Sequence, residues 1–392
     1  MSITTLSVAF IPLTDAAPLI AAEEMGFARE EGLELDLVRA PSWSSLRDML
    51  AFGRVEAAHL LSPVPVAMAL GIGGVTSAIS ALMVLSMNGT VIGVSNDLAR
   101  RLKERLGSFD FRDATAAGQA LASVSEAPLR IGVPFPFSMH AELLYYWLAA
   151  SGLPAPQGVT IRTVPPPLMA DALAADEIDA FCVGEPWGSK TVDAGVGELL
   201  LPGAAIWSAA PEKVLAARTQ WVQDNPDLTA RLMRSVWKAA RWLETGGAET
   251  TASELLSRTP YLNLAPDIID RAFTGRFEIN ARGDVRDCPD FLRFFRGATN
   301  FPWRSQAAWI GGQMASRLGL ERAQAATAAR QVFRTDLYRL HLADAGATLP
   351  GASEKTEGGI DEGTAAASEN GRLIFAENRF FDGRVFDPAA DY

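Results

Sequence analysis

A carboxylate, a proline and a large aromatic ring stand together at one point of this sequence. Glu185, Pro186 and Trp187 follow the apolar residues 180–183 and Gly184. A short apolar run bounded by turn residues predicts a buried strand, and the residues just after such strands lie at the sheet edge where open α/β folds hold their ligands. This stretch is therefore a candidate ligand site. The plainer interpretation, loop chemistry around a core tryptophan, stays open beside it.

Further polar and aromatic residues stand where other predicted strands end or helices begin. They are Thr14, Asp15, Ser42, Trp43, His59, Asn88, Gly89, Thr90, Ser138, His140 and Lys213. Because backbone N–H groups at helix N-termini favour an anion, converging loops of this kind predict an anion site in a cleft. Each residue also has a plainer interpretation. His140 could be bonded to backbone at a helix start, His59 could be a satisfied strand histidine, and Lys213 could be a solvated lysine at the start of a helix.

The surrounding pattern predicts the elements that would bring these residues together. Strand-like segments alternate with helical ones, which indicates an α/β fold with parallel sheets. Strands are predicted at residues 6–11, 33–38, 55–60, 79–85, 91–95, 129–133 and 180–184. Helices are predicted at residues 16–25, 44–52 and 140–151, and beyond residue 205 at residues 211–223, 226–245, 251–257, 266–273 and 305–342.

The order of these elements predicts two lobes, since 392 residues exceed what one hydrophobic core usually holds. Lobe 1 is predicted to comprise residues 1–95 and 205–392, and lobe 2 residues 96–204. Residues 343–370 are rich in Ala, Gly, Ser, Thr, Glu and Asp, which predicts a flexible insert within lobe 1. Phenylalanines return after residue 374 and predict that the tail docks on the body.

Composition and motifs exclude several classes of protein. The net charge of −11 argues against direct nucleic-acid binding, which needs clustered Lys and Arg. Two cysteines without a CxxC pair and three histidines favour neither a disulfide framework nor a metal site. The sequence has no phosphate-binding loop, dinucleotide fingerprint or nucleophile elbow, so we expect no cofactor and no enzyme. We find no membrane-spanning apolar run and no export signal after Met1, and we therefore expect a cytoplasmic protein.

Several motifs in order resemble one known family. They lie at residues 10–19, 40–43, 57–63, 87–89, 165–167, 182–187 and 381–388. The chain resembles the nitrate- and bicarbonate-binding proteins of cyanobacterial-type ABC importers and their soluble relatives. This resemblance implies an α/β, two-lobed periplasmic-binding-protein-like (type II) fold, with parallel-sheet lobes and a ligand cleft between them that closes on one small oxyanion.

The resemblance also implies site residues. Trp43, His140 and Lys213 fall where that family contacts its anion, and two pocket loops contribute Asn88 with Gly89 and Gly184 with Glu185. Thr90 stands where the nitrate transporters often carry an amide side chain. The ligand-binding residues predicted in this way are Trp43, Asn88, Gly89, Thr90, His140, Glu185 and Lys213. A carboxylate would be misplaced against an anion, so we expect Glu185 to pair with Lys213 or His140 and to hold that donor in position.

Within that family the chain resembles the cytoplasmic nitrate/nitrite sensors of the NasS type. The resemblance implies that nitrate or nitrite controls the release of an RNA-binding transcription antiterminator, a NasT-like partner, for nitrate assimilation genes. An acidic protein and a basic partner have complementary potentials. The alternative is the substrate-binding component of an ABC importer for nitrate, nitrite or bicarbonate. A third interpretation, an enzyme of thiamine-precursor synthesis with the same fold, is disfavoured because no catalytic His-Cys arrangement stands near a cofactor lysine.

Overall fold

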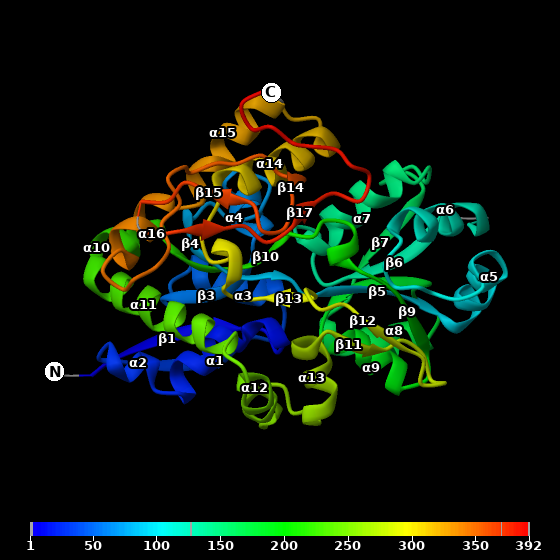
Figure 1. Cartoon of the computed structure of the whole chain (residues 1–392), viewed down its shortest axis with the longest axis horizontal. Helices are drawn as coiled ribbons and strands as arrows, with labels where there is room; N and C mark the ends of the chain where they lie inside the picture. The colour runs from blue at the N-terminus through cyan, green and yellow to red at the C-terminus, as the bar shows by residue number, and fades with distance from the viewer. Residues whose placement is uncertain (1–2, 126–127, 370, 391–392) are drawn as a thin grey trace.

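The computed structural model describes residues 3–125, 128–369 and 371–390, and in these residues two separate sheets lie at the centres of two lobes (Figure 1). The first sheet has six strands, and its strand β1 pairs in parallel with β2 and β3. β10 and β13 run antiparallel to their neighbours, so the sheet is mixed rather than wholly parallel. Its strand order is β13 (Leu292–Arg293), β4 (Ile79–Asn88), β10 (Pro211–Arg218), β3 (Ala57–Leu61), β1 (Thr4–Phe10) and β2 (Leu33–Arg39).

Helices cover both faces of the first sheet, because successive side chains of each strand point to opposite faces and most of them are apolar. Leu6 and Leu215 face one apolar core, and Leu60 and Val214 face the other. The first face is covered by α1 (Ala17–Glu24), α2 (Phe27–Glu30), α11 (Pro226–Leu243) and α16 (Thr335–Leu342). The second face is covered by α3 (Trp43–Ala51), α4 (Pro63–Ala69), α14 (Arg304–Leu318) and α15 (Arg322–Val332).

The second lobe is built on five strands of the described chain, also in a mixed sheet. β6 pairs in parallel with β7 and β8, and β5 runs antiparallel between β8 and β9. The strand order is β7 (Val159–Thr163), β6 (Leu129–Val133), β8 (Ala180–Gly184), β5 (Thr90–Ser95) and β9 (Gly197–Pro202). The helices of this lobe are α5 (Asn96–Leu106), α6 (Ala114–Val124), α7 (Met139–Ala150), α8 (Met169–Ala174) and α9 (Trp187–Asp193). The predicted strands and helices up to residue 201 are thus confirmed, with ends that differ by a few residues.

The chain crosses from the first sheet to the second at Gly89. β4 ends at Asn88, whose φ is 62°, and β5 begins at Thr90. Gly89 has a φ of 94°, and a Cβ there would lie 2.8 Å from Leu292 Cδ1, so the crossing needs glycine. Residues 90–95 therefore belong to the second sheet, although they were predicted to lie in lobe 1.

β10 corrects a prediction. Residues 211–223 were expected to be helical, but residues 211–218 form a strand between β3 and β4, and the short helix α10 (Thr219–Asp224) follows. The run from Val214 to Ala217 is apolar on both sides, so its pattern fits a buried strand as well as a buried helix. Pairing with two neighbouring strands decides the outcome.

Part of residues 343–369 packs against lobe 1, while most side chains from 361 to 369 are exposed; the flexibility of 343–370 stays a prediction, and Asn370 lies outside the described residues. Leu349 and Glu357 are buried, and Glu357 accepts hydrogen bonds from Ser305 and Asn378. Polar contacts of this kind replace the large apolar side chains that the segment lacks. Its short strand pairs are β14 (Gly359–Ile360) with β17 (Asn378–Arg379), and β15 (Ala365–Ala366) with β16 (Leu373–Ile374).

The tail docks on the body as predicted. Phe380 packs against both Trp207 and Trp309, with ring centroids 4.9 and 5.7 Å away, and the two tryptophans also contact each other. Tyr146 of the second lobe contacts Phe380 and Trp309. The remaining elements are α12 (Ala248–Ser257), α13 (Pro266–Thr274), β11 (Arg276–Glu278) and β12 (Val285–Asp287).

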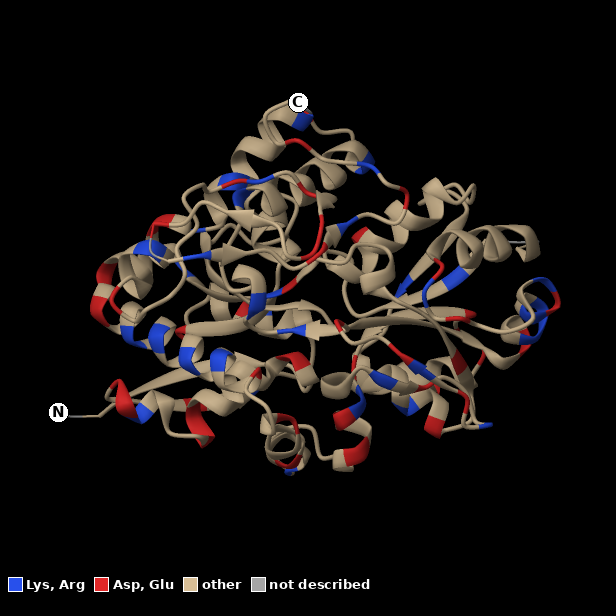
Figure 2. Cartoon of the chain, in the orientation of Figure 1, with Lys and Arg blue, Asp and Glu red and all other residues tan. Residues whose placement is uncertain are grey.

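Charged residues of both signs are interspersed over the surface (Figure 2). A basic row runs along α11, where Arg234 and Lys238 pair with Glu31, just after α2, and Lys238 also pairs with Glu30, the last residue of α2. Within the described residues, no helix combines the length and the apolar character needed to cross a bilayer.

Candidate anion site between the lobes

A lysine without solvent contact lies at the junction of the two lobes. Lys213 of β10 is fully buried, and its Nζ donates to Asp15 Oδ2 at 2.6 Å and to Glu212 Oε1 at 2.8 Å. The same Nζ stands 5.5 Å from the centre of the Trp43 ring. A buried ammonium has to be paired, and here two carboxylates and an aromatic face surround it.

An irregularity in β10 places the two adjacent charged residues against each other. Pro211 pairs with Met87 and Lys213 with Ser86, so Glu212 is an extra residue on the β10 side of the ladder. Adjacent strand residues ordinarily point to opposite faces, and a bulge changes that direction locally. The side chains of Glu212 and Lys213 consequently meet instead of diverging.

Two histidines complete the arrangement. His59 of β3 has Nε2 3.0 Å from Asp15 Oδ1, and His140 of α7 has Nδ1 3.2 Å from Glu212 Oε1. Both imidazoles are fully buried. Because α7 belongs to the second lobe and β10 to the first, the contact between His140 and Glu212 crosses from one lobe to the other. We call the six residues Asp15, Trp43, His59, His140, Glu212 and Lys213 the junction cluster.

Serine caps position two members of the junction cluster. Ser42 Oγ accepts from Ser45 N and begins α3, so Trp43 is its first residue. Ser138 Oγ accepts from Ala141 N and begins α7, so His140 lies in its first turn. Such caps fix the start of a helix, and they hold both rings where helix N-termini meet the cleft side of the sheets.

Several buried polar atoms of the junction have no hydrogen-bond partner within the described part of the chain. They include Trp43 Nε1, His140 Nε2, Thr14 Oγ1, Ser86 Oγ and Glu212 Oε2. A buried polar atom without a partner is costly, by about 1–3 kcal/mol each. The indole N–H of Trp43 is a donor, and the hydroxyls of Thr14 and Ser86 can donate, as a site for a small acceptor molecule requires. Glu212 Oε2 is an acceptor and would oppose such a molecule while it is ionised.

Burial and pairing set the protonation of the junction cluster. Burial opposes the charge of Lys213, but Asp15 and Glu212 outweigh it and raise the pKa of the ammonium. Burial also opposes the charge of Asp15, yet Lys213 and His59 lower its pKa to about 2. Burial raises the pKa of Glu212 to about 7 despite the attraction of Lys213.

The histidines are held neutral. Burial lowers the pKa of His59, against the opposing effect of Asp15. Burial and then the charge of Lys213 lower the pKa of His140 well below its ordinary value. A neutral imidazole carries one N–H donor and one acceptor nitrogen, so the hydrogen bond at one nitrogen decides what the other offers.

The structure brings three of the predicted site residues together, uses Asn88, Gly89 and Glu185 in other contacts, and leaves the predicted ligand role of Thr90 a prediction. Trp43, His140 and Lys213 lie in the junction cluster. The side-chain amide of Asn88 is hydrogen-bonded to backbone at both ends: its nitrogen donates to Ser208 O at 2.9 Å and its oxygen accepts from Ala210 N at 3.1 Å. Gly89 serves the crossing, and its N–H donates to Phe291 O at 2.7 Å. Thr90 is buried at the start of β5, close to Gly203, where an added Cβ would lie 2.2 Å from Thr90 Oγ1.

Glu185 does not pair with Lys213 or His140, so that prediction is wrong. Its carboxylate turns into its own lobe and accepts from Ser189 N at 3.1 Å, and burial raises its pKa to about 7. The Glu185–Pro186 peptide bond is cis, and the backbone oxygen of Glu185 accepts from Thr14 N at 2.9 Å across the lobes. Trp187 Nε1 likewise donates to Pro12 O at 2.7 Å. This stretch therefore joins the lobes through main-chain contacts.

Sequence reasoning missed Glu212 and undervalued Asp15 and His59. The charged pair Glu212 and Lys213 interrupts a run that is otherwise apolar from Val214 onward. That interruption was the available signal, because charges inside an apolar strand are rarely buried unless they are paired. The pair did not indicate a buried site, because residues 211–223 were expected to form a helix whose first residues face solvent.

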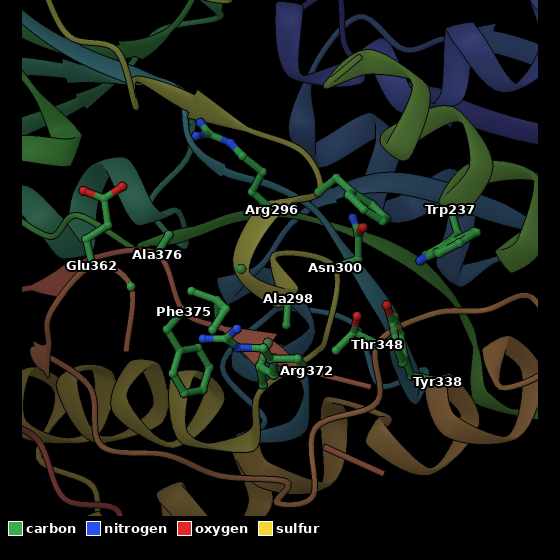
Figure 3. A pocket seen from close by; sticks show the side chains of 15 residues that line it. Trp237, Arg296, Ala298, Asn300, Tyr338, Thr348, Glu362, Arg372, Phe375 and Ala376 are labelled. Atoms are coloured by element: carbon green, nitrogen blue, oxygen red, sulfur yellow. The ribbon is translucent and has the colours of Figure 1, made fainter. Parts of the chain in front are cut away.

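A separate cavity lies in the first lobe, away from the junction cluster (Figure 3). It has a volume of about 430 Å³ and is walled by Trp237, Phe295, Tyr338 and Phe375, with Arg372 among its lining residues. None of the junction cluster residues lines it. The cavity is larger and more aromatic than a three- or four-atom anion needs, so the two places suit different molecules.

Comparison with known proteins identifies relatives over most of the chain. Residues 2–257 match the model of the NMT1-like family. The nitrate/nitrite binding protein NrtA of Synechocystis is 30% identical over 397 residues, covering 98% of this chain and 83% of the relative. The nitrate import ATP-binding protein NrtC of Synechocystis is 32% identical over 312 residues, covering 79% of this chain. The chain spans 45% of the length of that NrtC protein.

A solved structure shows the same architecture. The periplasmic nitrate-binding protein NrtA from Synechocystis superposes with a TM-score of 0.83 at 26% identity, covering 99% of this chain and 96% of that one. The expectation of a two-lobed periplasmic-binding-protein fold is thereby confirmed, with mixed instead of purely parallel sheets.

Proposed function

This chain belongs to the NMT1-like family, with nitrate/nitrite binding proteins among its relatives, and from that premise we propose that it binds nitrate or nitrite between its lobes. The observation that carries the proposal is the junction cluster. The ammonium of Lys213 is buried 5.5 Å from the centre of the Trp43 ring, and Trp43 Nε1 and His140 Nε2 have no partners among the described residues.

The chemistry of the cluster suits a small planar oxyanion. Lys213 has three N–H donors, of which two point at Asp15 and Glu212. The third, together with the indole N–H of Trp43 and an N–H of His140, could donate to three oxygens of one anion. Hydrogen bonds with a charged partner are shorter and stronger than neutral ones, which lets a weakly hydrated monoanion leave water.

Ligand binding of this kind would couple to lobe closure. Lys213 and Trp43 come from the first lobe and His140 from the second, so an anion held by all three favours the arrangement in which the lobes meet. An anion shifts that equilibrium only by its differential affinity for the two arrangements. The relatives named for nitrate binding and import support a role as the substrate-binding component of an importer, with no chemical reaction at the site.

The cytoplasmic sensor of the NasS type is the second candidate. The net charge of −11 supports it, since an acidic surface would complement a basic RNA-binding antiterminator. In that role the protein would reside in the cytoplasm and release its partner when nitrate closes the lobes.

The binding test is calorimetric titration of the desalted protein with nitrate, nitrite and bicarbonate, in a buffer free of oxyanions and sulfonates. We expect saturable binding of nitrate or nitrite. No heat and no thermal stabilisation with either anion would overturn the proposal, and selective binding of bicarbonate would move it to bicarbonate.

Deletion of the gene separates the two roles. Loss of nitrate uptake at low external nitrate, with normal induction of nitrate assimilation genes, supports the importer component. Normal uptake with expression that no longer responds to nitrate supports the sensor, and cell fractionation would then have to find the protein in the cytoplasm.

A further inference from the structure

The junction cluster carries one negative charge too many for an anion site. With both histidines neutral, Lys213 contributes one positive charge and Asp15 and Glu212 two negative charges, so the cluster has a net charge of −1. All these side chains are at most 2% exposed. Adding a monoanion would bring the buried charge to −2, and uncompensated buried charge is strongly unfavourable.

We propose that the site takes up one proton with each monoanion it binds, that Glu212 and His140 share this proton, and that Glu212 thereby selects singly charged oxyanions over dianions. This inference rests on the proposed anion-binding function and specifies the ligand's charge and its linkage to pH. One added proton returns the occupied cluster to a net charge of −1, the value it has before the anion enters.

The geometry gives the proton a second effect, on His140. Nδ1 of His140 lies 3.2 Å from Glu212 Oε1, near enough for a proton to pass but without the geometry of a hydrogen bond in the described chain. When Glu212 is ionised, its charge favours the proton on Nδ1, and Nε2 is then a lone pair that repels an anion. When the pair gains a proton, Nε2 carries a hydrogen in either arrangement, whether Glu212 donates to Nδ1 or the imidazole is positive. The proton thus removes a charge from the pair and creates the donor at Nε2, which has no partner within the described chain.

The groups around Glu212 identify it as the titrating residue. Lys213 lies beside it on β10, Asp15 approaches from the loop after β1, and His140 approaches from α7. His59 acts through Asp15, and Cys182 of β8 is near enough for Glu212 to raise its pKa. Asp15 accepts from Lys213 and also contacts His59, whereas Glu212 Oε2 has no partner in the described residues. The value of about 7 for the pKa of Glu212 agrees with this assignment.

The experiment measures protons directly. Sodium nitrate is added to the weakly buffered full-length protein at about pH 8 in a pH-stat, and the acid needed to hold the pH is compared with the nitrate bound. We expect about one proton per nitrate, and a nitrate Kd that rises about tenfold per pH unit above the titration of Glu212, as linkage of one proton requires. Sulfate should bind at least about a hundredfold more weakly than nitrate, since each extra buried charge is opposed.

Two variants sharpen the result. Glu212→Gln keeps the shape, removes the charge and can donate to His140 Nδ1, so it should bind nitrate without proton uptake and with a Kd independent of pH. Glu185→Gln is the matched control, because Glu185 is also buried with a pKa raised to about 7 but turns to Ser189 instead of the junction. It should keep the proton uptake of the unmodified protein.

The results of these experiments separate the proton-uptake inference from the proposed anion-binding function. Saturable nitrate binding without proton uptake, or proton uptake that persists in Glu212→Gln, would overturn this inference and leave the proposed function standing. Sulfate binding as tight as nitrate would overturn the selection by charge. Absence of nitrate and nitrite binding at every pH tested would overturn both the inference and the proposed function.

Discussion

Arg317 of α14 and Glu142 of α7 join the two lobes through a bidentate ion pair. Arg317 Nη1 donates to Glu142 Oε2 at 2.7 Å and Nη2 donates to Oε1 at 2.5 Å. Glu142 is 1% exposed, and it stands two residues after His140 on the same helix. The pair therefore fixes the helix that brings the second lobe's contribution to the junction cluster.

Replacing Arg317 by methionine should destabilise the protein and weaken nitrate binding. The change leaves Glu142 buried without its cation, which costs about 3–5 kcal/mol when one partner of a buried pair is lost. Urea unfolding measures this loss. The double variant Arg317→Met/Glu142→Gln should regain much of the stability, because no unpaired charge remains. If the single variant is as stable as the unmodified protein, the ion pair does not hold the lobes.

Replacing Lys213 by methionine should abolish most anion affinity. Hydrogen bonds to charged groups contribute about 1.5–3 kcal/mol each, so we expect the nitrate Kd to rise by about tenfold to a hundredfold. Methionine fills a similar volume but leaves Asp15 and Glu212 buried without their cation, so the variant should also be less stable. Calorimetric titration measures the Kd. Arg372→Ala, at the separate cavity, is the control and should leave the Kd unchanged. Equal affinity in Lys213→Met would place the anion elsewhere.

Replacing Trp43 by phenylalanine separates its ring from its donor. Phenylalanine keeps an aromatic face near Lys213 but loses the indole N–H, which has no partner within the described residues, together with part of the buried ring volume. We expect a nitrate Kd about three- to tenfold higher, the effect of one neutral hydrogen bond, and a smaller loss of stability than truncation to alanine causes. Trp43→Ala should in addition destabilise the fold by about 3–5 kcal/mol. Unchanged affinity in Trp43→Phe would exclude a contact between the indole N–H and the anion.

Without ligand, the free energy of unfolding should fall as the pH rises from about 5 to about 8. The pKa values of Glu185 and Glu212 are raised from 4.5 to about 7 in the folded protein. The folded state therefore binds more protons than the unfolded state between these values, and stability decreases with pH across that window. Across the whole window, one such pKa difference lowers the free energy of unfolding by on the order of 3 kcal/mol. Urea unfolding at both pH values measures the loss, which Glu185→Gln/Glu212→Gln should largely remove.

Asp15 gives the opposite dependence at acid pH. Its pKa is lowered from 3.8 to about 2 in the folded protein, so its contribution is complete above 3.8 and is lost as the pH falls through that interval. The contribution is on the order of 2 kcal/mol. Asp15→Asn should unfold at a lower urea concentration than the unmodified protein at neutral pH, and the difference should shrink below about pH 3 as Asp15 itself becomes protonated. A constant difference over the acid range would contradict this assignment.

The sequence predicted the alternating strands and helices up to residue 201, because apolar runs and turn residues mark them locally. It also led to Trp43, His140 and Lys213 through a resemblance. It did not reveal the strand β10. The residues from Val214 to Ala217 are all apolar, so they show neither the periodicity of a helix nor that of a strand. Only pairing with β3 and β4 determines their conformation. The role of Glu212 depends on that strand, and so it was missed as well.

The tasks of Asn88 and Glu185 could not be predicted for a related reason. Both are polar residues at strand ends, where ligand contacts and main-chain contacts look alike in a sequence. Asn88 satisfies the backbone of Ser208 and Ala210, which lie more than a hundred positions away. Glu185 turns towards the start of its own helix. Only the path of the chain in space distinguishes these contacts from a ligand site.

The extra residue in β10 has a consequence for how related proteins change their ligand. Glu212 is an extra residue on the β10 side of its pairing with β4, and this places its side chain beside Lys213. A single substitution there would change the charge that an incoming ion meets and leave Lys213 in place. On the proposed role of Glu212, a change at this single position is enough to alter which anion the site prefers.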